Sequence, residues 1–472
     1  MTLSPPAADP AQDNSKPGLA EKILFGNQPS PELAAILTVY FVQGILGLAR
    51  LAVSFFLKDD LGLSPAQVSA LMGFVVLPWM LKPLYGFISD GLPILGYRRR
   101  PYLILSGLLG AGSWVALATV VDSAVGATVA IALSSLSIAI ADVIADSLVV
   151  ERVRQESQAA AGSLQSLCFG TSALGGVLTA YFSGFLLEHV STRMVFAITA
   201  SFPLIVSLVA GLIAEEKVVT RSNWSVVGTQ IQQLRRAIAQ RAIWMPTLFI
   251  FIWQATPTSE SAFFFFSTNE LGFPPEFLGR LRLVTSLAAL LGAWLFQRFF
   301  RAVPFRKIFA WTIVISTVVG LTSLLLVTHA NRSLGIGDRW FSLGDSLVIT
   351  VMGEIAYLPV LVLAARICPP GIEATLFALL MSVFNLAGLL ANEVGAGLTH
   401  LLGVTETNFE HLWLLVLITN LSNLIPLPFV GMLPNGGDRP DGTTELEWST
   451  DASEAAEVRG ELAPVSEEAV RS

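Results

Sequence analysis

The stretch that decides the fold reads Leu77-Pro-Trp-Met-Leu-Lys-Pro-Leu-Tyr-Gly-Phe-Ile-Ser-Asp90 and continues, five residues later, with Gly96-Tyr-Arg-Arg-Arg-Pro-Tyr102. Its first part ends an apolar run that covers roughly residues 67–88. A helix that crosses a bilayer needs about 20 mostly apolar residues. Connections rich in lysine and arginine remain on the cytoplasmic side of the membrane. The stretch therefore predicts a membrane-spanning helix that ends at a cytoplasmic loop.

The same pattern of apolar runs recurs along all 472 residues. The chain is 53% hydrophobic and only 13% charged, which excludes a disordered protein and argues against a soluble enzyme. These features predict an all-α polytopic membrane protein with twelve transmembrane helices in two six-helix halves. The expected spans lie at about 32–57, 67–88, 102–121, 125–150, 163–187, 195–214, 243–266, 277–300, 308–327, 343–365, 373–402 and 412–432.

The chain divides into five parts on this pattern. From Asp438 to the end the charge is −7, so that the remainder is neutral and offers no basic surface for nucleic acid. Acidic segments with few large apolar residues are typical of disorder. The predicted parts are a disordered cytoplasmic N-terminus (1–31), an N-terminal six-helix half (32–214), a central cytoplasmic loop (215–242), a C-terminal six-helix half (243–432) and an acidic disordered cytoplasmic tail (433–472).

Basic residues set the expected orientation, since they gather in alternate connections and in the central loop. Both termini should therefore be cytoplasmic. Two cysteines and four scattered histidines offer no disulfide framework, metal site or nucleophile–base pair. No glycine-rich phosphate loop ends in Lys-Ser/Thr. We therefore expect neither an enzyme nor an ATP-driven pump, and no cofactor.

The six-plus-six layout resembles the major facilitator superfamily, in which two six-helix halves surround a cavity at the membrane midplane. The connection after the second span, with Asp90 and then Arg98, Arg99 and Arg100, is similar to the loop motif of that superfamily but carries an insertion. A carboxylate and arginines can form charge-assisted hydrogen bonds that open and close between the halves. The alternative is a basic loop that only sets topology.

Ionisable residues inside spans are costly, so each is a candidate for function. Asp142 and Asp146 lie four residues apart and therefore share one helix face. The other candidates for substrate binding or proton coupling are Lys82, Arg50, Gln43, Glu354, Arg366, Asn385 and the aromatic Trp79.

Two carboxylates in a site of low dielectric constant repel each other, so one of the pair is expected to keep its proton near neutral pH. This property suits a proton-coupled step, and the same oxygens can accept N–H groups from a planar heterocycle. The alternative is a structural ion pair of Asp142 or Asp146 with Lys82. Glu260 follows a break at Trp253-Gln-Ala-Thr-Pro257, and it forms with Arg50 either an outer gate or packing support.

Four stretches together resemble the folate–biopterin transporters, a family of the major facilitator superfamily. They are Tyr40-Phe-Val-Gln-Gly-Ile-Leu-Gly-Leu-Ala-Arg50, the stretch from Leu77 to Tyr102, Asp142-Val-Ile-Ala-Asp146, and Glu373-Ala-Thr-Leu-Phe-Ala-Leu-Leu-Met-Ser382 with Asn385. The resemblance covers about Tyr40 to Met432. It implies transport of folates or related pterins driven by a proton gradient, and it is greatest to cyanobacterial and plastid members.

We therefore predict a secondary transporter that moves folates or pterins, together with protons, by alternating access. It should be a monomer. The first thirty residues lack the arginines of a transit peptide, so the expected location is a bacterial, cyanobacterial-type plasma membrane. Two alternatives stay open. One is an assembly factor for pigment–protein complexes that transports nothing, and the other is a major facilitator carrier for another heteroaromatic anion.

Overall fold

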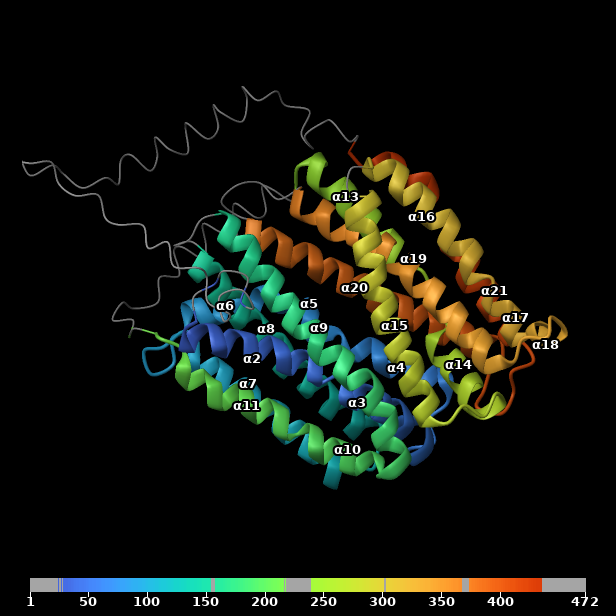
Figure 1. The fold of residues 1–472 in the computed structure, drawn as a ribbon, viewed down its shortest axis with the longest axis horizontal. Coiled ribbons are helices and arrows are strands. Elements are labelled where there is room, and N and C mark those ends of the chain that lie inside the picture. The colour runs from blue at the N-terminus through green and yellow to red at the C-terminus, as the bar shows by residue number, and fades with distance from the viewer. Residues whose placement is uncertain are drawn as a thin grey trace, which may run out of the picture. The chain divides into compact units, whose positions relative to one another are not determined.

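The computed structural model of the chain is built of helices (Figure 1). It describes Leu24, Asn27 and residues 29–153, 158–215, 217, 239–300, 303–366 and 373–434. Within these residues the only β-type pairing is one bridge between Ile94 and Tyr97. The predicted all-α class is confirmed. Most of the predicted N-terminal segment, central loop and acidic tail lies outside the described residues.

The first half of the sequence forms ten α-helices, several of which join end to end into longer rods. In chain order they are α2 (Pro31–Ile45), α3 (Leu48–Phe55), α4 (Pro65–Val75), α5 (Leu77–Met80), α6 (Lys82–Gly91), α7 (Arg100–Thr119), α8 (Ala124–Val153), α9 (Gln158–His189), α10 (Thr192–Thr199) and α11 (Ser201–Val209).

The second half forms nine more within its described residues. They are α13 (Arg241–Gln254), α14 (Glu260–Phe265), α15 (Pro275–Leu295), α16 (Phe305–Gly320), α17 (Ser323–Val327), α18 (Ala330–Ser333), α19 (Asp338–Arg366), α20 (Glu373–Leu401) and α21 (Leu412–Ser422).

Within the described residues, eleven of these helices or joined helices are long and apolar enough to cross a membrane. The other expected span, Ile243–Phe266, is interrupted: α13 ends at Gln254 and α14 begins at Glu260. Pro257 lies in this interruption, and proline has no N–H to donate within a helix. The chain is thus a multi-pass membrane protein, and the count of twelve spans stays a prediction.

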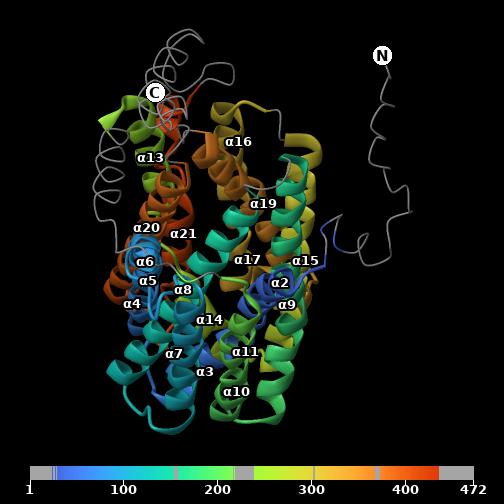
Figure 2. The same ribbon diagram turned by 90° about the vertical axis from the view of Figure 1, so that its left-hand side faces the viewer.

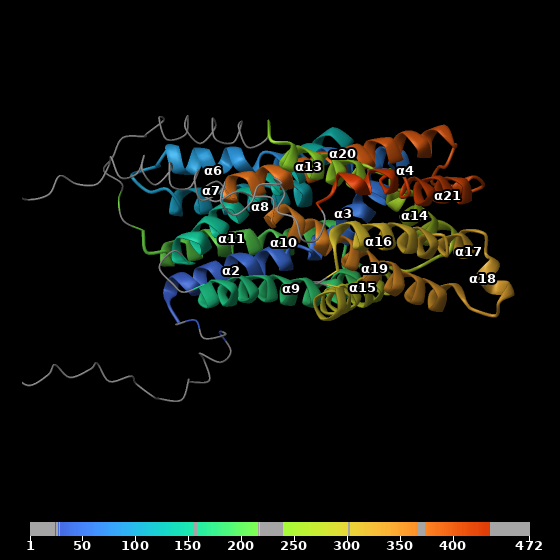
Figure 3. The same cartoon turned by 90° about the horizontal axis from the view of Figure 1, so that it is seen from above.

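Contacts divide the chain into two compact units, each of which takes residues from both sequence halves. The first unit comprises Met1–Ser64, Phe74–Asn223 and Gly272–Ser286. In it α7 packs along α8, and α2 lies beside α9 (Figure 3). The α2–α9 contact depends on glycine, because a Cβ on Gly44 would lie 2.1 Å from the carbonyl oxygen of Ser172. Small residues allow such close approach between membrane helices.

The second unit comprises Pro65–Gly73, Trp224–Leu271 and Leu287–Ser472. Here α16 packs along α19, and α13 lies beside α20 (Figure 2). Phe249 and Phe309 are fully buried in its core, with ring centroids 5.1 Å apart. The five-part division of the chain stays a prediction beside these two units.

Candidate functional site

Five side chains of the first unit form a cluster between helices α2, α5, α6 and α8. We call it the charged cluster: Tyr40, Trp79, Lys82, Asp142 and Asp146. Four of the five are residues that the sequence marks as candidates, and the structure brings them together from segments far apart in the chain.

Lys82 and Asp142 form the ion pair of this cluster. The Lys82 ammonium donates to Asp142 Oδ2, and the two side chains are only 18% and 13% exposed. The same ammonium lies 4.5 Å from the centre of the Trp79 ring. A cation above an aromatic face is attracted by the ring quadrupole. Trp79 thus supports the charge of Lys82, and the structural ion pair expected for Asp142 is present.

Asp146 has a different partner. The hydroxyl of Tyr40 donates to Asp146 Oδ1, while Tyr40 itself is only 3% exposed. Asp146 remains accessible to solvent. Among the described residues no lysine or arginine forms an ion pair with it. An accessible carboxylate in a membrane helix faces a water-filled space rather than lipid. Asp146 is thus the accessible carboxylate of the cluster, and its role in proton coupling or substrate binding stays a prediction.

Tyr40 is the residue that the sequence does not mark as a site residue. Its hydroxyl reaches Asp146 across 106 positions in the chain. Buried tyrosine hydroxyls usually find a hydrogen-bond partner, so a tyrosine in an apolar span near intramembrane carboxylates is a usable signal.

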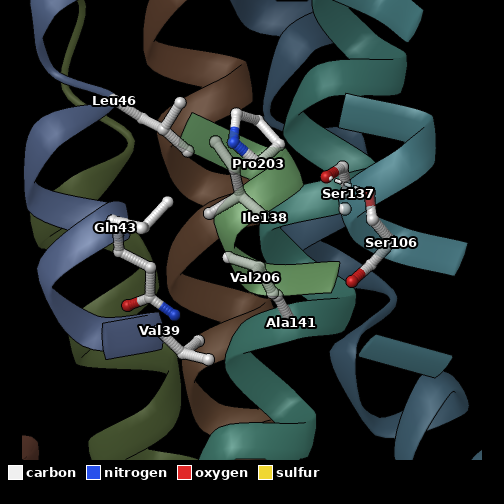
Figure 4. A pocket seen from close by; sticks show the side chains of 11 residues that line it. Val39, Gln43, Leu46, Ser106, Ser137, Ile138, Ala141, Pro203 and Val206 are labelled. Atoms are coloured by element: carbon white, nitrogen blue, oxygen red, sulfur yellow. Dashed lines mark hydrogen bonds between the residues drawn. The ribbon is translucent and has the colours of Figure 1, made fainter. Parts of the chain in front are cut away.

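Gln43, one turn further along α2, lies at a separate small cavity (Figure 4). The cavity has a volume of about 10 Å³ and is lined by α2, α7, α8 and α11. The Gln43 amide nitrogen is buried there without a partner in the described part of the chain. Across the cavity, Ser137 Oγ donates to the Ser106 carbonyl at 2.6 Å. Such a volume holds about one water molecule, so a role of Gln43 in binding cargo stays a prediction.

The backbone of the three arginines of the predicted gate is held by Glu215 at the start of α7. The carboxylate of Glu215 accepts the backbone N–H groups of Arg98, Arg99 and Arg100, and for Arg100 the distance is 3.1 Å. A negative charge at a helix N-terminus is favourable because the N–H groups there lack partners. The Arg99 guanidinium also donates to Ser89 Oγ at 3.0 Å.

These contacts all lie within the first unit, and Glu215 is a second residue that the sequence does not mark. The side chain of Asp90 lies outside the described residues, as does that of Arg366. A gate that opens and closes between the halves therefore stays a prediction.

The remaining candidates are spread over both units. Arg50 is exposed on α3 in the first unit, whereas Glu260 is exposed at the start of α14 in the second, so their pairing also stays a prediction. Glu354 is half-buried on α19, where Gly292 allows α15 to approach: a Cβ there would lie 2.7 Å from Glu354 Cβ. Asn385 is half-buried on α20.

The described residues contain no group of three or more histidine, cysteine, aspartate or glutamate side chains placed to hold a metal ion. The charged cluster instead consists of one ion pair and one hydrogen-bonded carboxylate. Such an arrangement can bind an anion through Lys82, and N–H donors or protons through the carboxylates.

Comparison with known proteins places the chain among transporters. It is 60% identical over 433 residues to the folate-biopterin transporter of Synechocystis sp., covering 92% of this chain and 88% of that one. It is 34% identical over 402 residues to folate transporter 2 of Plasmodium falciparum, covering 84% and 88% of the two chains.

Solved structures show the same fold at low sequence identity. A nucleoside transporter is 13% identical with a TM-score of 0.64, covering 85% of this chain and 98% of that one. A D-xylose–proton symporter is 14% identical with a TM-score of 0.62, covering 88% and 100%. The fold is thus the major facilitator fold, as expected. The model of the BT1 family matches residues 43–447. The chain therefore belongs to the BT1 family and is a membrane transporter.

Proposed function

We propose that this chain is a secondary transporter that carries folates or related pterins, together with protons, by alternating access. The observation that supports the proposed cargo is the sequence identity of 60%, over 92% of the chain, to a protein named a folate-biopterin transporter. The matched region of 433 residues extends into both halves of the chain. The cargo assignment thus follows from relatives, and the site gives a chemical account of it.

The charged cluster supplies both kinds of group that a folate needs. Folate carries an anionic glutamate tail and a pteridine ring with N–H donors. An ammonium such as that of Lys82 binds a carboxylate, and a carboxylate such as that of Asp146 accepts adjacent N–H groups. Asp146 is accessible, while Lys82 is held in place by Asp142 and Trp79.

Coupling to protons follows from competition for Lys82. An incoming anion that takes the Lys82 ammonium leaves Asp142 without its partner. Asp142 and Asp146 then stand four residues apart on one face of α8 as two unpaired carboxylates, which repel each other. A proton on either of them removes this repulsion, so binding of anion and binding of proton favour each other. This reciprocity is the thermodynamic basis of symport.

We further propose that both termini are cytoplasmic and that the protein works as a monomer in a bacterial plasma membrane. The distribution of lysine and arginine supports the orientation. The relative in Synechocystis supports the bacterial membrane.

The test is uptake of labelled folic acid into proteoliposomes that contain the purified full chain, with and without an inward proton gradient. We expect gradient-dependent accumulation that unlabelled pterins compete away. A matched control uses labelled D-xylose, since a protein of the same fold carries it with protons.

Flux that equilibrates without accumulating contradicts proton coupling but keeps the cargo. Absence of folate flux, with a melting transition that shows a folded protein, contradicts the proposed cargo. The assembly-factor alternative would then be examined by co-purification with pigment–protein complexes.

A further inference from the structure

A polar cavity lies in the second unit, at the interruption between α13 and α14. It has a volume of about 370 Å³ and is lined by the interruption itself and by α20 and α21. We call it the break pocket. Pockets that bind small molecules measure roughly 300–1,000 Å³. The break pocket is therefore of ligand size, unlike the cavity at Gln43.

The backbone of the interruption explains why the pocket is polar. The Thr258 N–H does not continue the helix but donates to the Ala391 carbonyl of α20 at 3.3 Å. Gly395 allows this approach, because a Cβ there would lie 2.2 Å from the Thr258 carbonyl oxygen. Non-helical backbone at membrane depth is tolerated only where it is buried in protein or lines a water-filled cavity. The residues of the interruption that line the break pocket are Thr256, Pro257, Thr258 and Ser259.

The lining supplies hydrogen-bonding groups with unused capacity. Thr256 Oγ1 donates to Asn423 Oδ1 at 3.0 Å, which leaves the Asn423 NH₂ group to donate. Asn392 Nδ2 donates to the Gly388 carbonyl at 2.9 Å, which leaves Asn392 Oδ1 to accept. The Gln254 amide also lines the pocket. Each of these amides can serve a neutral polar ligand.

Glu260 is the one ionisable side chain of the lining. Its side chain is exposed and forms no ion pair within the described residues, whereas Asp142 and Asp146 already hold Lys82 and Tyr40. Among the described residues, no lysine or arginine lines the pocket. The break pocket therefore disfavours an anion and suits a ligand that presents adjacent N–H donors to a carboxylate.

We propose that the break pocket binds the 2-amino-4-oxo pyrimidine edge of a pteridine ring. In this assignment the Glu260 carboxylate accepts from the ring N–H and the exocyclic amine, and the pocket amides pair with the remaining ring nitrogens and the carbonyl. The inference rests on the proposed pterin cargo. It replaces Asp146 with Glu260 as the acceptor of the ring N–H donors, so that the charged cluster keeps Lys82 for an anion and Asp146 for a proton.

The test compares two ring systems that differ at this edge. Pterin has the 2-amino group, and lumazine has a carbonyl oxygen in its place. Binding of each to the purified full chain in detergent is measured by the quenching of the ligand's fluorescence. We expect the unmodified protein to prefer pterin by at least about tenfold, since a lost hydrogen bond to a charged group is worth about 1.5–3 kcal/mol.

Glu260→Gln should reduce this preference to within about threefold, because the amide is uncharged and presents an NH₂ donor where the carboxylate has its second accepting oxygen. Glu410→Gln is the matched control, since Glu410 is an exposed glutamate next to the start of α21 and does not line the pocket. It should keep the full preference. Asn392→Leu provides a second variant with similar side-chain volume, and it should weaken binding of both ligands.

An unchanged preference in a folded Glu260→Gln protein overturns the inference, as does an unmodified protein that does not distinguish the two rings. Folic acid uptake into proteoliposomes is measured on the same preparations. Uptake by the unmodified protein together with an unchanged preference in Glu260→Gln refutes the break pocket alone. Absence of uptake with a Glu260-dependent preference refutes the proposed cargo transport and supports the break pocket.

Discussion

Asp142 and Asp146 occupy the same face of α8 but differ in what they contact. Asp142 holds an ammonium and Asp146 holds a phenol, so only Asp142 is neutralised by an opposite charge. Asp146 is also the accessible member. At the scale of single residues, this difference leads us to propose that Asp146 carries the exchangeable proton in the resting state and that Asp142 takes that role only after an anion has taken Lys82.

Asp146→Asn should abolish gradient-driven accumulation of folic acid. Asparagine keeps an oxygen that accepts from Tyr40, but it cannot bind a proton. Uptake into proteoliposomes should therefore fall to the level of protein-free vesicles, while the melting temperature in detergent changes little. Asp122→Asn is the control, since Asp122 is 77% exposed and pairs with Arg193. Normal accumulation by the Asp146 variant would remove this residue from the coupling mechanism.

Lys82→Met should destabilise the protein because it leaves Asp142 half-buried without a partner. Breaking a buried ion pair by removing one member costs about 3–5 kcal/mol, and the partial exposure of both side chains places the expected loss at the lower end. The double variant Lys82→Met/Asp142→Asn should recover most of the melting temperature, as measured by thermal unfolding in detergent.

Uptake by that double variant then separates the two interpretations of the pair. A protein that is stable but does not take up folic acid has lost a functional group. A protein that is stable and accumulates folic acid normally shows that Lys82 and Asp142 serve structure alone.

Among the elements, the packing of α2 against α9 depends on particular glycines. Gly175 faces α2, and a Cβ there would lie 2.6 Å from the carbonyl oxygen of Phe41, whereas a Cβ on the neighbouring Gly176 would meet nothing within 4 Å. Of these two adjacent glycines, Gly175 has no room for a side chain whereas Gly176 has. Only the packing of α9 against α2 distinguishes them.

Gly175→Ala should therefore lower the melting temperature in detergent, because the backbone of α2 must shift to admit a methyl group. Overpacking of this kind costs about 1–3 kcal/mol. Gly176→Ala is the adjacent control and should leave the transition unchanged. Equal melting temperatures for the two variants would mean that α2 and α9 do not pack as the structure has them.

The start of α7 shows how an element can depend on a distant residue. The arginine triplet is conspicuous in the sequence, but its backbone N–H groups are held by Glu215, more than a hundred positions later. The arginine triplet therefore marked this connection in the sequence as a candidate site, but it did not identify Glu215 as the partner of its backbone N–H groups.

For the whole molecule, the sequence places the net charge of −7 in the segment that begins at Asp438. The charged cluster and the break pocket lie in described residues before that point. Deletion of residues 438–472 should therefore leave folic acid uptake within about twofold of the full chain. Loss of uptake by a truncated protein with a normal melting transition would show that the acidic segment takes part in transport.

The fold of the molecule is compatible with several cargoes. It is shared at 13% and 14% identity with proteins named for nucleosides and for D-xylose. Folds host many functions, and function belongs to the site. Discrimination between pterin and other solutes therefore has to come from side chains such as those of the charged cluster and the break pocket.

The sequence by itself determined the helical membrane class, the approximate spans and the family, because run length, charge distribution and motif identity are local properties of the chain. Only the tertiary structure decided which partner each intramembrane charge meets. Lys82 and Asp142 are 60 positions apart, and Tyr40 and Asp146 are 106 apart. It also decided that Ile243–Phe266 is interrupted and that the interruption encloses a ligand-sized pocket with Glu260. Such contacts depend on how helices pack, and packing is set by side chains on several segments at once.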